Sequence, residues 1–196
     1  MEDSKHPMLP LKLKIIKSTD KMDSEVKNII LKFLFTFNVF ESEFFKEPKW
    51  DESHDKPQKD YKEVWERIND MQNTCYENNF PIEQLNRFQS HFSSIYLDGK
   101  VHTFRFESLR QTEYNKNGFT DKQMKHIEDF LTIPLERNKR FAVKNALTLS
   151  YKFRNNLFHG KKDISELCEY KEDFEEITNF LISLMNYFNE INAEDF

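Results

Sequence analysis

Glycine, cysteine and long apolar runs are all scarce in this chain of 196 residues. Only three positions are glycine, so the backbone makes little use of left-handed turns. Cys75 and Cys168 lie far apart with no histidine or cysteine at metal-binding spacing, which excludes a disulfide scaffold and a zinc motif at the level of sequence. The N-terminus lacks the apolar core of a signal peptide, and charged residues interrupt the most apolar region, 28–45. We therefore expect a soluble, cytoplasmic protein with no membrane partner.

Phenylalanine, by contrast, is abundant, with 20 residues in the chain. Such a composition supplies an aromatic core, and together with the shortage of glycine it favours helices. The length is that of one ordinary domain. We expect residues 1–23 to form an N-terminal arm and residues 24–196 to form a single helical domain.

Apolar residues recur at alternating steps of three and four along most of the chain, the spacing of amphipathic helices. This predicts an all-α fold, an antiparallel helical bundle of about five to six helices. A short hairpin at Asp98-Gly99, or an irregular insertion, is expected within 98–118. The predicted helices cover 24–46, the segment from Tyr61 to Cys75, a helix opened by Pro81, the segment from the Thr120 capping box to Leu131, 137–158, and a last helix through Ile191.

Basic charge is concentrated in one segment of an otherwise acidic protein. Residues 137–162 hold eight lysines and arginines and no acidic residue, whereas the remainder has 21 basic and 34 acidic residues. Such segregation is typical of a surface that binds a polyanion, above all a phosphate backbone. A basic solvated face is the alternative. Attraction of cations to a helix C-terminus accounts for Lys152, Arg154 and His159 but not for the basic residues at 137–140.

The most specific pattern within this segment is RNNLFH, residues 154–159. It resembles the motif of the HEPN superfamily, with Arg154, a polar residue at Asn155, three further residues and then His159. The motif ends the penultimate long helix, as in that family, and the first helix resembles the opening helix of bacterial HEPN proteins. The resemblance implies a metal-independent endoribonuclease without a cofactor, acting as the toxin of a toxin-antitoxin pair or as an antiviral defence component.

The chemistry of RNA cleavage matches these residue types. Attack by the 2'-hydroxyl needs a base, the leaving 5'-oxygen needs an acid, and the phosphorane between them needs positive charge. His159 can transfer protons near neutral pH, and Arg154 has a fork shaped for phosphate oxygens. Asn155 either orients the imidazole or hydrogen-bonds the phosphate. For His159 the alternative is a helix-end histidine that contacts a carbonyl.

One histidine does not readily act as both the general base and the general acid of one reaction. The resemblance implies a homodimer whose two motifs lie paired in a shared cleft. Glu41 could pair with Arg154 and fix its fork, with Asn38 and Asn156 as further supporting residues. Alternatively, Glu41 and Asn38 lie at the edge of the core with their tips in water. The expected RNA-binding residues are Lys152, Lys161, Lys162, Lys144 and Arg140, of which Lys152, Lys161 and Lys162 are expected nearest the phosphate.

Two other classes of function remain open: a non-catalytic HEPN-type module that binds RNA or a nucleotide or mediates dimerisation, and a helical interaction protein unrelated to nucleic acid. The intact Arg154, Asn155 and His159 favour the enzyme, whose substrate would be tRNA or mRNA. HEPN toxins controlled by nucleotidyltransferase antitoxins often carry tyrosine two residues after the histidine. That position is Lys161 here, so control by that route is not expected.

Overall fold

The computed structural model describes residues 23–44, 61–99, 101–111, 118–158 and 167–194. Almost all of the predicted arm, 1–23, lies outside these ranges, as does the predicted helix break after residue 46. Within them the chain is mostly helical, which confirms the all-α bundle. None of the helices in these ranges is long and apolar enough to span a membrane.

Six long helices account for most of the described residues, in agreement with the predicted number. They are α2 (Ser24–Phe44), α3 (Tyr61–Glu77), α4 (Ile82–Tyr96), α6 (Asp121–Thr132), α7 (Leu135–Phe158) and α9 (Lys171–Glu194). The short elements are strands β1 (Leu97–Asp98) and β2 (Val101–His102), the single-turn helix α5 (Phe104–Glu107) and the 3-10 turn η2 (Cys168–Tyr170).

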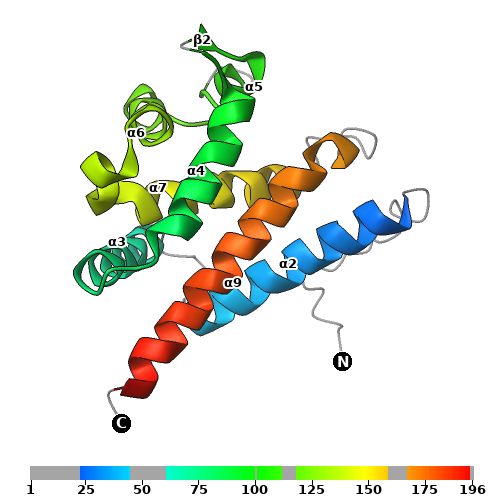
Figure 1. Ribbon diagram of the computed structural model, residues 1–196. Coiled ribbons are helices and arrows are strands. Elements are labelled where there is room, and N and C mark those ends of the chain that lie inside the picture. The colour runs from blue at the N-terminus through cyan, green and yellow to red at the C-terminus, as the bar shows by residue number, and fades with distance from the viewer. Residues whose placement is uncertain (1–22, 45–60, 100, 112–117, 159–166, 195–196) are drawn as a thin grey trace, which may run out of the picture.

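The direction of the helices differs from the prediction in one pair. Helices α2 and α9 lie side by side and run in the same direction (Figure 1), with ring centroids 4.9 Å apart for Phe33 and Phe174 and 5.3 Å apart for Phe44 and Phe188. No short loop joins these two helices, so nothing in the connection imposes an antiparallel packing. Helices α4 and α9 are antiparallel, because Arg87 contacts Glu176 while His91 contacts Asp173.

Helix α7 crosses the other helices and is buried over much of its circumference (Figure 1). The predicted buried stripe is confirmed at Ala142, Ala146, Leu149 and Phe153, while the side chain of Leu157 lies outside the described residues. Further buried residues occupy other faces of the helix, from Val143 to Lys152. The helix that carries the motif is therefore held firmly by its neighbours.

Local signals in the sequence are confirmed at two places. Thr120 caps α6 and exchanges hydrogen bonds with Gln123 in a capping box. Strands β1 and β2 form the predicted hairpin, and Gly99 takes a φ of 64° at its turn, a conformation that glycine adopts without strain. The single turn α5, capped by the Thr103 hydroxyl, was not predicted because four residues are too short for a periodic pattern.

Candidate functional site

The motif lies at the end of α7, where the structure describes its first two members. The Arg154 guanidinium donates from Nη1 to the Asn155 Oδ1 at 3.1 Å. The arginine side chain is 18% exposed, so part of it reaches the surface. His159, which follows α7 directly in the sequence, lies outside the described residues together with Gly160, Lys161 and Lys162. Of the three motif residues, the structure thus describes Arg154 and Asn155 but not His159.

Glu41 of α2 holds the other edge of the Arg154 fork. Arg154 Nη2 donates to Glu41 Oε2 at 2.9 Å, and the two side chains are 18% and 16% exposed. This contact confirms the pairing that the sequence left open against a solvent-exposed Glu41. Asn38 is exposed on α2, as its alternative interpretation had it, and the side chain of Asn156 lies outside the described residues. Arg154 is therefore oriented by a carboxylate 113 residues away in sequence.

Tyr151 completes this group, although no pattern in the sequence points to it. It lies one helical turn before Arg154, at the i, i+3 spacing that brings side chains to one face. Its ring packs edge-on against Phe37 of α2 at 5.0 Å. Burial raises the pKa of the Tyr151 hydroxyl, and the charge of the nearby Glu41 raises it further, while Arg154 lowers it. We call Glu41, Tyr151, Arg154 and Asn155 the α7-end cluster.

The raised pKa of Tyr151 predicts a loss of stability at alkaline pH. An unfolded tyrosine releases its proton near pH 10, whereas the folded state retains it, so the free energy of unfolding falls as pH rises above about 10. Tyr151→Phe should reduce this slope by up to about 1.4 kcal/mol per pH unit. Urea unfolding of both proteins between pH 8 and 11 measures the difference. Parallel stability curves for the two proteins would contradict the prediction.

The expected RNA-binding residues are not all placed on an open surface. Arg140 is exposed and lies against the Phe141 ring at 5.7 Å. Lys144 donates from Nζ to Asn69 Oδ1 of α3 at 2.7 Å and is partly exposed. Lys152 is only 4% exposed, with its ammonium 5.5 Å from the centre of the Phe119 ring. Lys152 is thus buried by the elements that cover α7 and does not lie on an open surface of the described residues.

A second polar cluster, which sequence reasoning missed, joins α4, α5 and α9. Asp173, at 1% exposure, accepts hydrogen bonds from His91 Nε2 at 2.9 Å and from the Arg105 guanidinium. The same guanidinium stacks over the Tyr170 ring at 4.4 Å. Nothing in the sequence connects His91 to Asp173, since 82 residues separate them. Hydrogen bonds from the imidazole and from the charged guanidinium satisfy the buried carboxylate here, and the cluster fixes the start of α9.

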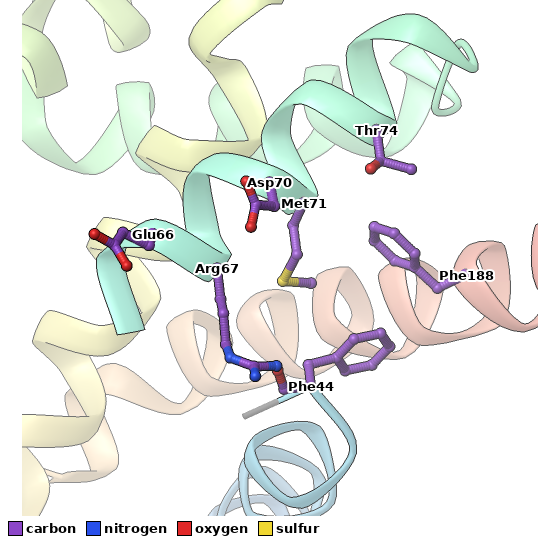
Figure 2. Close-up of a pocket in the computed structure, with 7 residues that line it drawn as sticks. All are labelled: Phe44, Glu66, Arg67, Asp70, Met71, Thr74 and Phe188. Atoms are coloured by element: carbon purple, nitrogen blue, oxygen red, sulfur yellow. The ribbon is translucent and has the colours of Figure 1, made fainter. Parts of the chain in front are cut away.

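Among the pockets that the described residues line, two lie away from the α7-end cluster. The first, of about 460 Å³, opens where α2, α3 and α9 meet, and Arg67 reaches across it to donate to the Phe44 carbonyl at 3.0 Å (Figure 2). Its lining residues are Phe44, Glu66, Arg67, Asp70, Met71, Thr74 and Phe188. The second, of about 730 Å³, lies beside the hairpin, where His102 stands 3.3 Å from both Glu107 and Glu128. Neither pocket is lined by a predicted site residue.

Comparison with known proteins found no match among protein families, curated proteins or solved structures. Among the side chains that the structure describes, no group of three or more histidines, cysteines, aspartates and glutamates could hold a metal ion. The chemical case for the site therefore rests on the α7-end cluster and on the basic segment that contains it.

Proposed function

We propose that this protein is a metal-independent endoribonuclease that cleaves RNA through attack of a 2'-hydroxyl on the adjacent phosphate. The observation that carries the proposal is the orientation of Arg154 by Glu41 and Asn155 at the end of α7. A guanidinium fixed in this way and still partly exposed suits a phosphate, with which it forms charge-assisted hydrogen bonds. The absence of acidic residues from 137–162 supports the same partner.

The proposed reaction assigns one role to each residue of the motif. His159 removes the proton of the 2'-hydroxyl or supplies one to the leaving 5'-oxygen. Arg154 stabilises the negative charge that develops on the phosphorane, and Asn155 holds the guanidinium. The new bond joins the 2'-oxygen to phosphorus as the bond to the 5'-oxygen breaks. The products are a 2',3'-cyclic phosphate and a free 5'-hydroxyl.

The proposal includes self-association, because a second protomer adds a second His159. One histidine then serves as base and the other as acid. We place such an enzyme in a toxin-antitoxin pair or in antiviral defence, where an antitoxin or another defence component would restrain it. Its RNA substrate would be tRNA or mRNA.

Incubation of the purified protein with total RNA and tRNA in EDTA tests the proposal. We expect fragments with 2',3'-cyclic phosphate ends, identified because they resist both 3' ligation and phosphatase until mild acid hydrolyses the ring to a phosphomonoester, which phosphatase then removes. Salt-sensitive RNA binding without any cleavage would replace the enzyme with a binding module.

Glu41 is a positioning residue in this proposal, and Glu41→Gln tests that role. Loss of the carboxylate charge frees the Arg154 fork, so we expect kcat to fall about tenfold while KM stays level or falls, because net positive charge at the site increases. Glu41→Asp should recover part of kcat. Glu43→Gln, an exposed position on the same helix, is the matched control and should cleave as the wild type does. A rise in KM at unchanged kcat would contradict the positioning role.

A further inference from the structure

The outward face of α2 carries an exposed stripe without charge. Six residues recur along it at alternating steps of four and three, directly opposite the side that packs on α9, and all six are exposed. They are Ser24, Asn28, Leu31, Phe35, Asn38 and Ser42. The side chains of Leu31 and Phe35 are 40% and 72% exposed at its centre. We call these six residues the α2 stripe.

An uncharged, exposed stripe is unusual in a chain in which 32% of residues are charged. The exposed residues beside the stripe on the same helix, Glu25, Lys32 and Glu43, are all charged. A large exposed aromatic residue with an apolar neighbour one turn away marks a contact surface when polar residues surround it. Figure 1 shows α2 at the edge of the described elements with α9 on its inner side, and the burial pattern places the six stripe residues on the face of α2 opposite α9.

The order of the residues identifies the partner. From either end the stripe presents serine, then asparagine, then an apolar residue, with its centre at position 33. A second copy running antiparallel about a two-fold axis would therefore place Leu31 against Phe35 and Asn28 against Asn38. Self-complementarity of this kind is what a two-fold interface requires, and a different protein would impose no such symmetry. The paired asparagine amides would fix the register, as a single buried asparagine does in coiled coils.

Residues beside the stripe fit the same pairing. On one flank Leu34 of one copy faces its counterpart in the other. On the other flank Lys32 approaches its counterpart near the axis, where its long stem lets the ammonium reach water. The stripe spans about 27 Å at a rise of about 1.5 Å per residue. Such a contact is small, and pairing in the micromolar range is expected.

We propose that two copies of this protein associate through the α2 stripe, with their α2 helices antiparallel about a two-fold axis. This contact differs from one that would join two motifs at a single phosphate. Glu41 lies eight residues from the centre, so the two α7-end clusters would be about 24 Å apart along the helix axes. The inference is thus independent of the proposed function, and a chain that used both contacts would form an assembly larger than a dimer.

The first test measures the mass of the protein in solution by light scattering. The protein concentrations run from about 1 to 100 µM, the range of the expected dissociation constant. The wild type should exceed the chain mass of 23.8 kDa as concentration rises. Phe35→Asp should weaken association about a hundredfold, because it places a carboxylate at the apolar centre. Phe104→Asp changes an aromatic residue that is 87% exposed on α5 and should associate as the wild type does. A monomeric wild type, or Phe35→Asp with wild-type mass, would overturn the proposal.

The second test is the register, read by disulfide cross-linking in a Cys168→Ser background that removes the exposed native thiol. Chains with Asn28→Cys are mixed with tagged chains with Asn38→Cys and oxidised. The mixed dimer should form, whereas like chains should not cross-link, because their cysteines would be about 15 Å apart along the axes. Links between like chains would mean a parallel pair and would overturn the proposed geometry. Measurement of RNA cleavage by Phe35→Asp separates this inference from the proposed function. Because Phe35 is not a member of the α7-end cluster, the substitution tests association without changing that cluster.

Discussion

Replacement of His159 with alanine is expected to lower the rate of RNA cleavage about 10²- to 10⁴-fold, the range that a positioned general acid or base contributes. The expected loss of rate is large because the chemistry proposed for the motif assigns proton transfer to His159 alone. The rate of cyclic phosphate formation, followed in EDTA on a short labelled RNA, measures the effect. His126→Ala is the matched control, because His126 is exposed on α6, and it should cleave at the wild-type rate.

Arg154→Ala should have an effect of similar size, about 10²- to 10³-fold, through loss of charge on the phosphorane. Arg154→Lys keeps the charge but loses the fork that Glu41 and Asn155 hold, so it should recover only a small part of the rate. Cleavage at the wild-type rate by both the His159 and Arg154 variants would mean a contaminating nuclease, and the site assignment would then be wrong.

Phe88→Ala is expected to destabilise the fold by about 3–5 kcal/mol, the typical cost of truncating a buried phenylalanine. Phe88 has no exposed surface, and its ring lies 4.6 Å from Phe92, 5.0 Å from Phe180 and 6.3 Å from Phe130, centroid to centroid. These rings belong to α4, α6 and α9, so a cavity at this point removes contacts from three helices. Large rings cannot collapse into the space without leaving their rotamers.

Urea unfolding at neutral pH measures this loss, and thermal unfolding should show a midpoint lower by about 6–20 °C for a domain of this size. Phe104→Ala is the control, because its ring is 87% exposed and its removal should change stability by less than about 0.5 kcal/mol. Equal stability of the two variants would show that the aromatic cluster does not carry the core.

Short-range patterns made much of the helical fold predictable. The spacing of Val26, Ile30, Phe33 and Phe37 defined α2, and all four are buried. The capping box at Thr120 placed the start of α6, because the interaction joins residues only three apart. The direction of α2 relative to α9 was not predictable, since no local signal acts between helices separated by most of the chain.

The residues of the candidate site were likewise predictable from the sequence only in part. Arg154, Asn155 and His159 follow from one stretch of sequence, because their spacing and chemistry are local. The sequence proposed Glu41 as a partner of Arg154 but could not choose between an ion pair and a solvent-exposed carboxylate. Burial of Lys152 was likewise hidden, because a lysine on a basic helix gives no sign of which neighbour covers it.

What the sequence determined by itself is therefore the set of helices, the aromatic core and the motif with its basic surroundings, all of which depend on residues within one or two helical turns. Only the tertiary structure decided that Glu41 meets Arg154 and Tyr151 and that Asp173 joins His91 to Arg105. It also decided that the α2 stripe faces outward. Each of these depends on how helices distant in sequence pack, and side-chain volume across the whole core sets that packing.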